Sequence, residues 1–352
     1  MEYQIVQHKL QFKKPAKTSR NVFKDRQIRY VLLSKNGITG IGECSPLHLL
    51  SIDDREDYDV YLHQFCKALS EGENIKDLDL GDFPSIRFGL ETALLDLENG
   101  GRRFVFKTDF VNGKPIPING LVWMADLDAM YTEAIAKIKE GYSCIKFKVG
   151  QHDFDAECRF LEKIRAHSDA FKLEIRLDAN GGFLKDDAMQ QLQDLHRFGI
   201  HSIEQPIQPK LWDDMAKLCL ESKIDIALDE ELIGVNVSKN GKALINHIKP
   251  QYLILKPNLI GGFSVSDEWI NLSQRNHTGW WATSALESNI GLNAIAQWVS
   301  QYDTEMPLGL GTGSLFTNNI SSPLAVKQQS LIYGSGDWDL ALLGWTKKNP
   351  TQ

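Results

Sequence analysis

The first forty-four residues alternate between apolar and polar positions in the way that β-strands do. Two alternating runs flank a polar loop around residues 18–21, and the Asn36-Gly37 pair is a strong signal for a hairpin turn. The pattern predicts an antiparallel meander with strands over residues 3–10, 27–33 and 38–43.

Helical periodicity replaces the alternation in the next two apolar segments. Apolar residues recur at intervals of three and four over residues 53–69 and 85–100. Pro84 is placed to open the second helix, and Gly100 is placed to end it. Residues 1–113 therefore form one predicted α+β unit.

Short apolar strands alternate with helices from residue 114 to residue 319. Such alternation predicts a parallel sheet, and eight strand–helix units are the number that closes a barrel. The helix after the eighth strand is weak, so the predicted fold class is α/β, a (β/α)7β-type TIM barrel with a separate α+β unit. Strand-like residues return within 320–352, and we expect this segment to join the N-terminal unit. The predicted strands cover residues 116–122, 143–149, 173–178, 202–204, 225–229, 252–256, 279–282 and 306–310, and the predicted helices cover 125–140, 153–166, 185–198, 210–222, 265–276 and 289–299, with a seventh before His247.

The composition narrows the class of ligand. The chain has 352 residues, of which 42% are hydrophobic and 24% charged, and its formal net charge is −7. Because acidic and basic residues are interspersed, a nucleic-acid-binding face is disfavoured. The sequence also lacks an apolar stretch of about 18 residues, the length that a membrane-spanning helix needs. We therefore expect a small-molecule partner and neither a nucleic acid nor a membrane; no feature indicates an oligomeric state.

The cysteines favour a reducing compartment. They are odd in number, form no C-x-x-C pair and fall in or beside apolar segments, which is typical of reduced, buried thiols. The first residues lack a basic region followed by an apolar run, so no leader is expected. The predicted location is the cytoplasm. The cysteines are Cys44, Cys66, Cys144, Cys158 and Cys219.

Five predicted strands end in a charged residue that an apolar strand should not carry. In chain order these residues are Lys148, Asp178, Glu204, Asp229 and Lys256, and successive members lie 25 to 30 residues apart. That interval matches one strand–helix–strand unit. Because the carboxyl ends of all barrel strands face one shared mouth, we expect the five side chains to converge.

The three carboxylates in this series indicate a metal site. On adjacent strands they would repel one another, so a positive group has to lie between them. Oxygen ligands without His or Cys favour a hard divalent cation, and we expect Mg²⁺, with Mn²⁺ as a substitute. The alternative is that each carboxylate independently caps the helix after it. Three carboxylates in register between two lysines make that alternative the weaker one.

The lysines indicate the chemistry. Residues two apart on a strand share a face, so Lys146 points the same way as Lys148, and Arg176 the same way as Asp178. Lys148 on the second strand and Lys256 on the sixth bracket a substrate from opposite sides. A free lysine titrates near about 10.4, and burial beside a cation lowers that pKa. The implied reaction is removal of a proton next to a carboxylate, through a metal-stabilised enediolate.

The ordered motifs resemble the enolase superfamily, specifically its muconate-lactonizing-enzyme-like subgroup. The matches are K-x-K at 146–148, D-A-N at 178–180, E-Q-P at 204–206, Asp229-Glu230 and Lys256-Pro257, and they extend over nearly the whole chain. The resemblance implies that Asp178, Glu204 and Asp229 ligate Mg²⁺. It also implies that Lys148 and Lys256 are the catalytic acid and base, that Lys146 supports Lys148, and that the α+β unit is a capping domain with loops around 19–21 and 42–47 over the substrate.

Within the subgroup, the chain is most similar to the o-succinylbenzoate synthase family in its Bacteroidetes-type form, through segments 119–121, 284–288 and 309–319. That resemblance implies a lyase of menaquinone biosynthesis that dehydrates a cyclohexadiene carboxylate. Lys148 would remove the α-proton and then protonate the departing hydroxyl, while Lys256 would stay protonated and face the ring. The expected substrate contacts are Arg20, Arg176, Asn180, Ser284, Gly311, Thr312 and Gly313.

Three other functions remain as alternatives. A dipeptide epimerase or N-acylamino-acid racemase uses both lysines, and such an activity could coexist with the first. Epimerases often carry an acidic motif after strand eight, whereas residues 311–314 hold no acid and offer backbone N–H groups to a carboxylate. A non-catalytic barrel predicts loss of at least one strand-end charge. Sugar-acid dehydration relies on a His–Asp pair, and residues 280–284 contain no His.

Overall fold

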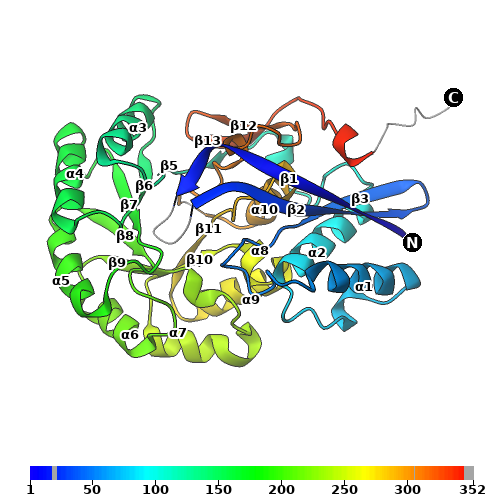
Figure 1. Cartoon of the computed structure of the whole chain (residues 1–352), viewed down its shortest axis with the longest axis horizontal. Helices are drawn as coiled ribbons and strands as arrows, with labels where there is room; N and C mark the ends of the chain where they lie inside the picture. The colour runs from blue at the N-terminus through cyan, green and yellow to red at the C-terminus, as the bar shows by residue number, and fades with distance from the viewer. Residues whose placement is uncertain (18–21, 305, 345–352) are drawn as a thin grey trace.

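The computed structural model describes residues 1–17, 22–304 and 306–344. Its centre is a seven-stranded parallel sheet in the order β11-β10-β9-β8-β7-β6-β5 (Figure 1). The register places Lys148 beside Asp178, and Asp178 beside Glu204. The strands are β5 (Gly120–Val122), β6 (Cys144–Lys148), β7 (Glu174–Asp178), β8 (Ile200–Glu204), β9 (Asp225–Leu228), β10 (Tyr252–Leu255) and β11 (Gly279–Ala282).

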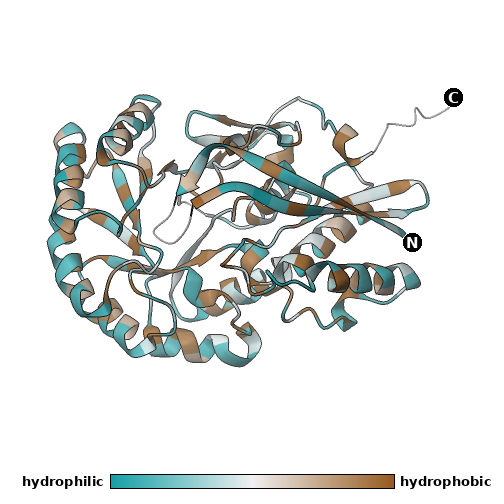
Figure 2. Ribbon diagram, in the orientation of Figure 1, coloured by the Kyte–Doolittle hydropathy of each residue, from teal (hydrophilic) through white to brown (hydrophobic). Residues whose placement is uncertain are grey.

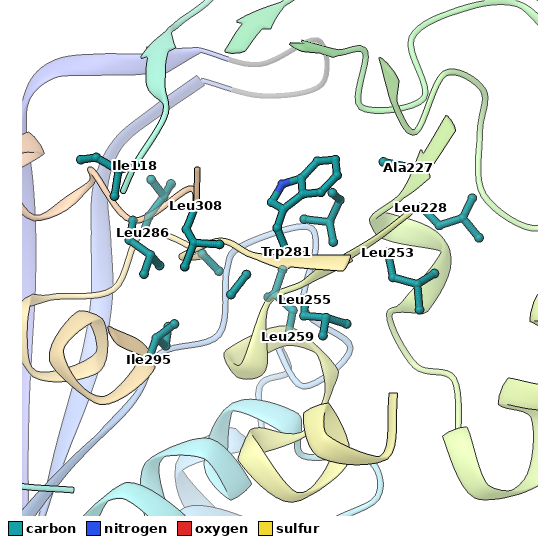
Figure 3. Close-up of a cluster of buried hydrophobic side chains, with 14 of the residues drawn as sticks. Ile118, Ala227, Leu228, Leu253, Leu255, Leu259, Trp281, Leu286, Ile295 and Leu308 are labelled. Atoms are coloured by element: carbon teal, nitrogen blue, oxygen red, sulfur yellow. The ribbon is translucent and has the colours of Figure 1, made fainter. Parts of the chain in front are cut away.

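An eighth segment closes the sheet into a barrel without forming a regular strand. Leu308 makes a single parallel bridge to Ile118, and Gly309 makes one to Thr283 on the other side. Figure 3 shows Ile118 and Leu308 close together among the buried apolar side chains. A regular eighth strand was predicted here; it is reduced to single bridges, because Pro307 has no N–H to donate to a ladder. The predicted (β/α)7β-type barrel is nevertheless confirmed.

The first predicted barrel strand is divided in two. Residues Ile116–Pro117 form β4, which pairs with β13 (Ser330–Tyr333) rather than with the barrel. The chain first meets the barrel at its eighth segment, where the Leu308 N–H donates to the Pro117 carbonyl at 2.9 Å and the Asn119 N–H donates to the Leu308 carbonyl at 3.0 Å. It then enters the parallel sheet as β5. The proline in β4 explains the division, since it cannot continue a ladder in a central strand.

The helices follow the strands around the outside of the barrel (Figure 1). Asp126 and Asp153 begin two of them, because their side chains accept hydrogen bonds from the N–H groups of Ala129 and Ala156. A short helix after β10, α8 (Pro257–Ile260), was not predicted. The other barrel helices are α3 (Leu127–Lys139), α4 (Phe154–His167), α5 (Lys185–His196), α6 (Trp212–Glu221), α7 (Lys242–Ile248), α9 (Gly262–Arg275) and α10 (Asn289–Val299), and single 3₁₀ or π turns are η1 (Ile75–Asp77), η2 (Asp109–Asn112), η3 (Glu230–Leu232), η4 (Val237–Gly241), η5 (Gly313–Leu315) and η6 (Ala341–Leu343).

The main apolar core lies between the barrel strands and their helices. Hydrophilic residues predominate on the outer helices in Figure 2, and hydrophobic residues recur along the strands. Phe147, whose side chain faces away from the barrel axis, packs edge-on against Phe160 of α4 with ring centroids 5.4 Å apart. Its neighbours on β6, Lys146 and Lys148, therefore point into the barrel.

The N-terminal unit is a three-stranded antiparallel sheet packed on two helices. The strands are β1 (Glu2–Lys17), β2 (Val22–Lys35) and β3 (Ile38–Cys44), and the helices are α1 (Tyr58–Glu71) and α2 (Pro84–Glu98). The predicted hairpin is confirmed, since Asn36 and Gly37 have φ angles of 53° and 77°. Helix α2 approaches β3 so closely that a Cβ on Gly42 would overlap the Gly89 carbonyl.

The C-terminal segment contacts both units. Its hairpin, β12 (Leu324–Lys327) and β13, extends β4, while Tyr333 of β13 packs against Phe110 of the N-terminal unit with ring centroids 6.0 Å apart. We keep the division into a cap (1–113, joined by 320–352) and a barrel (114–319) as a proposal.

No helix in the three described ranges has both the length and the apolar character needed to cross a membrane.

Candidate active site

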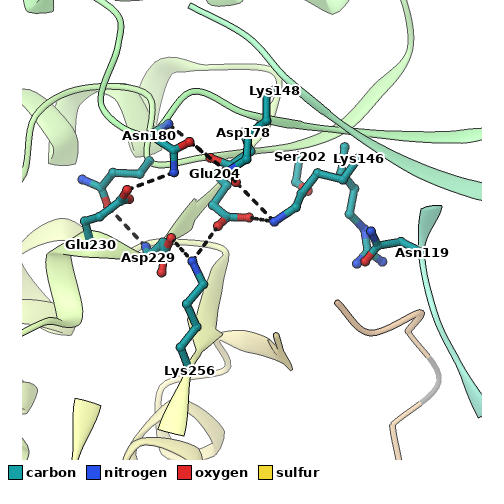
Figure 4. Close-up of polar contacts among 12 residues, drawn as sticks. Asn119, Lys146, Lys148, Asp178, Asn180, Ser202, Glu204, Asp229, Glu230 and Lys256 are labelled. Atoms are coloured by element: carbon teal, nitrogen blue, oxygen red, sulfur yellow. Dashed lines mark hydrogen bonds and ion pairs between the residues drawn. The ribbon is translucent and has the colours of Figure 1, made fainter. Parts of the chain in front are cut away.

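The strand-end charges come together at the carboxyl ends of β6 to β10. Lys148 Nζ lies 2.5 Å from Asp178 Oδ2, and Lys146 Nζ lies 2.7 Å from Glu204 Oε2 and 3.2 Å from Asp178 Oδ2. Across the site, the Lys256 ammonium contacts Asp229 and lies 3.5 Å from Glu204 Oε1 (Figure 4). All six side chains are buried or nearly so. The sequence spacing therefore reflects one cluster.

The helix-cap alternative does not describe these carboxylates. The side chains that cap barrel helices are Asp126, Asp153 and Ser288, none of which belongs to the strand-end series. Asp229 precedes the turn η3, but its side chain makes no capping hydrogen bond.

The carboxylates can be compared with the requirements of a metal site. In the described part of the chain, no group of three or more His, Cys, Asp or Glu side chains is arranged to hold a metal ion as it stands. Lysine ammonium groups lie between the carboxylates instead. The donor chemistry nevertheless fits a hard cation, because the Asp178, Glu204 and Asp229 oxygens converge and buried Glu204 Oε1 lacks a hydrogen-bond partner.

The carboxylates also set the charge of two lysines. Burial alone would lower the pKa of Lys256, but Asp229, Glu204 and Glu230 outweigh it and raise that pKa. The pKa of Lys146 is raised in the same way, since Glu204 and Asp178 outweigh burial. Both of these lysines therefore carry a positive charge.

Asn180, Glu230 and Trp123 complete the surroundings of Lys148. The Asn180 Oδ1 accepts a hydrogen bond from Lys148 Nζ at 2.8 Å, and its Nδ2 donates to Glu230 Oε1 at 3.0 Å. The Trp123 ring centroid lies 5.9 Å from Lys148 Nζ, within cation–π range. From the sequence, Glu230 was named only as part of a matching motif, without a role, and Trp123 was not named. Two sequence features could have indicated them. Glu230 lies in the acidic triplet 229–231 after β9, and Trp123 follows by two positions Leu121, which lies beside Lys146 in the sheet register.

A cavity of about 200 Å³ lies over the charged cluster. Lys146, Lys148 and Lys256 line its floor together with Asp178 and Asn180. The N-terminal unit and the loops after β5, β10 and β11 supply apolar walls. The apolar lining includes Phe23, Leu47, Leu49, Leu50, Leu121, Trp123, Leu259, Leu286 and Leu315.

Some of the expected substrate contacts line this cavity. Ser284, Gly311 and Thr312 do so along with Asn180, and the Ser284 and Thr312 hydroxyl oxygens are 2.5 Å apart. Arg20 lies outside the described residues.

Arg176 and Gly313 do not line the cavity. The Arg176 guanidinium donates to Glu174 and to the Pro307 carbonyl, and it lies 4.5 Å from the Trp281 ring centroid. It shares a face with Asp178 but lies two residues deeper in the barrel, roughly 6–7 Å at strand rise. A Cβ on Gly313 would meet α10 side chains rather than open space. Both expectations are corrected for this reason.

A further buried carboxyl group, that of Glu287, lies in the loop after β11. Burial raises the pKa of Glu287 from 4.5 to about 7; Arg26 opposes that shift and Glu43 adds to it. Between pH 4.5 and about 7, Glu287 is therefore protonated in the folded protein and ionised in the unfolded chain. This contribution to stability is present at low pH and is lost as the pH rises towards about 7.

We expect Glu287→Gln to stabilise the protein at pH 8 by about 1–3 kcal/mol and to leave its stability at pH 4.5 nearly unchanged. Glutamine mimics the protonated acid and keeps an acceptor for the Ala285 N–H, 2.8 Å away. Urea unfolding at several pH values measures the effect. A stability difference that does not vary with pH would contradict the assignment.

Comparisons with known proteins agree with this architecture. Residues 129–315 match the family model described as "Enolase C-terminal domain-like". The o-succinylbenzoate synthase of Desulfotalea psychrophila is 44% identical over 358 residues, which cover 93% of this chain and 97% of that protein.

Solved structures extend the similarity to three dimensions. The crystal structure of MenC from Desulfotalea psychrophila has a TM-score of 0.84 at 41% identity, covering 94% of this chain and 99% of that one. A dipeptide epimerase from Enterococcus faecalis, complexed with Mg and the dipeptide L-Leu-L-Tyr, has a TM-score of 0.82 at 16% identity, covering 96% and 97%. The second likeness concerns the fold alone.

Proposed function

Because the chain belongs to the enolase C-terminal domain-like family, we propose that it acts as an o-succinylbenzoate synthase. The reaction is the syn-dehydration of 2-succinyl-6-hydroxy-2,4-cyclohexadiene-1-carboxylate to 2-succinylbenzoate. The observation that carries this proposal is the 44% identity to the synthase of Desulfotalea psychrophila over 93% of the chain. The lysine–carboxylate cluster supports it, since each side chain that the reaction needs contacts another.

Lys148 is the proposed base. It takes the proton from the ring carbon that bears the carboxylate, and the electron pair enters an enediolate. The same ammonium then gives that proton to the hydroxyl on the neighbouring carbon, so that the C–O bond breaks and water leaves. Aromatisation drives this step. Asp178 and Asn180 support the assignment because they hold Lys148 Nζ at 2.5 and 2.8 Å.

Asp178, Glu204 and Asp229 are the proposed ligands of a divalent cation, Mg²⁺ with Mn²⁺ as a substitute. When bound, the cation neutralises charge that develops on the substrate carboxylate. Lys146 contacts two of the three ligands and adds positive charge beside Lys148.

Lys256 is the proposed permanent cation on the opposite side of the substrate. Its ammonium contacts Asp229 and lies 3.5 Å from Glu204 Oε1, and a charged ammonium in this place suits a contact with the ring face rather than a proton transfer. Ser284, Thr312 and Gly311 are proposed to bind the succinyl group, since their hydroxyl and backbone groups line the same cavity. We propose a cytoplasmic enzyme without nucleic-acid or membrane partners.

Turnover of the cyclohexadiene substrate with Mg²⁺, followed by its absorbance, tests the function. We expect loss of the diene absorbance with formation of 2-succinylbenzoate. L-Ala-L-Glu incubated in D₂O is the matched probe for epimerase chemistry, and we expect its deuterium uptake to be far slower. Deuterium uptake without dehydration would overturn the proposal in favour of an epimerase.

A further inference from the structure

Asn258 links the strand that carries Lys256 to the N-terminal unit. It lies in the first turn of α8, two residues beyond Lys256, and is fully buried. Its Nδ2 donates to the Ser45 carbonyl at 2.8 Å, across 213 residues of sequence. Arg26 of β2 also donates to that carbonyl. The Ser45 carbonyl, just after β3, is therefore bound both to β2 and to α8 of the barrel.

Ser45 begins a compact turn that forms part of the cavity wall. The Leu47 N–H donates to Ser51 Oγ at 2.8 Å, and the Ser51 N–H returns a hydrogen bond to the Leu47 carbonyl at 2.9 Å. Leu47 and Leu50, from this turn, line the cavity above Lys256. The Ser45 carbonyl, two residues before Leu47, is thus a point at which the barrel contacts the segment that leads into this wall.

A second attachment lies two residues before Ser45, at the end of β3. Glu43, the penultimate residue of β3, accepts from the Ser288 N–H at 3.0 Å, from Ser288 Oγ at 2.5 Å and from the Gly291 N–H at 3.1 Å. These donors lie at the start of α10, which suits a carboxylate. The segment 43–45 is thus bound to the loops after two neighbouring barrel strands, β10 and β11.

We propose that Asn258 is a positioning residue that sets the Leu47 wall of the cavity relative to Lys256. The inference rests on the proposed function and adds how its substrate is held. The Asn258 amide can serve only in one orientation, since its Oδ1 has no partner and would repel the Ser45 carbonyl if the group were reversed. Loss of this donor removes the hydrogen bond from the barrel to the Ser45 carbonyl, while Arg26 still donates to that carbonyl and Glu43 still holds β3 in place.

Asn293 offers a control with the same chemistry elsewhere in this interface. It is also buried, and its Nδ2 donates at 2.9 Å to a backbone carbonyl of the N-terminal unit, that of Arg103. Neither Asn293 nor Arg103 lines the cavity. Asn293→Ala therefore removes an equivalent bond together with a second one, from Gln297 Nε2 to Asn293 Oδ1 at 2.8 Å. Only Asn258→Ala acts between a cavity wall and a site lysine.

The test compares the two variants as full-length enzymes with Mg²⁺. For Asn258→Ala we expect KM to rise about tenfold, since that is the fold-change for a lost hydrogen bond. We expect kcat to stay within threefold of wild type. For Asn293→Ala we expect both constants within twofold despite a similar fall in melting temperature. In a double variant with Leu47→Ala, the Asn258 change should add little, since both act through one wall.

Hydrogen exchange in the absence of substrate separates this inference from the proposed function. Amides of residues 45–51 should exchange faster in Asn258→Ala and as in wild type in Asn293→Ala. Absence of synthase turnover in the wild type would refute the proposed function. The hydrogen-exchange result would still test whether Asn258 holds residues 45–51 in place. Unchanged exchange, equal KM effects of the two variants, or additive effects with Leu47→Ala would each overturn the role of Asn258.

Discussion

Replacement of Lys148 by alanine is expected to lower kcat by about 10⁴-fold or more, because one side chain performs both proton transfers. The fold should survive. Lys146 remains 3.2 Å from Asp178 Oδ2, so that buried carboxylate keeps a positive partner. Steady-state turnover of the cyclohexadiene substrate measures the loss, and circular dichroism checks the fold.

Lys148→Arg is the matched control for charge. Arginine keeps a cation beside Asp178 but does not release its proton near neutral pH. We expect this variant to be as inactive as the alanine variant, which would separate the need for a base from the need for a positive charge. Substantial activity in either variant would exclude Lys148 as the base.

Removal of divalent metal is expected to abolish turnover, with recovery on addition of Mg²⁺. The three carboxylates converge with their lysines in a buried site, where a bound cation would add to the positive charge that stabilises the enediolate. Glu204→Gln should weaken Mg²⁺ binding in calorimetry and lower kcat/KM by about 10³-fold, since it removes one anionic ligand without changing shape.

Glu91→Gln provides the control for that variant. Glu91 is a half-buried carboxylate that accepts backbone hydrogen bonds, from Phe263 and Ser264, but it does not line the cavity. Its replacement should leave Mg²⁺ affinity unchanged. Full activity of the wild type after exhaustive chelation, or unaltered Mg²⁺ binding by Glu204→Gln, would refute the metal site.

Much of the fold and of the charged cluster could be predicted from local rules. Strand and helix periodicity located the barrel, and the Asn36-Gly37 pair located the hairpin. The cluster followed because strand ends are marked by polarity and because parallel strands meet at one edge. Lys148, Asp178 and Glu204 are neighbours in the sheet register, as their spacing predicted.

Two expected substrate contacts, Arg176 and Gly313, do not line the cavity, because of their depth in the barrel and their packing against α10. Arg176 has the right face but lies below the cluster, where Glu174 and Pro307 accept its donors. Gly313 belongs to the segment 309–319 that carried the resemblance. It lies against α10, and a Cβ at this position would meet the side chains of Asn289 and Leu292. Glu230 and Trp123 lie in loops after β9 and β5. The folding of these loops brings Glu230 against Asn180 and Trp123 against Lys148.

The sequence by itself determined the barrel, the order of its charged strand ends and the family, because periodicity and motif spacing are local properties of the chain. The tertiary structure decided which of those charges touch, which polar residues line the cavity and how the N-terminal unit is bound above Lys256. Those features depend on contacts such as Asn258 to Ser45 and Glu43 to Ser288, which join residues more than two hundred positions apart. No local pattern encodes such a contact, since the partner is chosen by packing of whole elements.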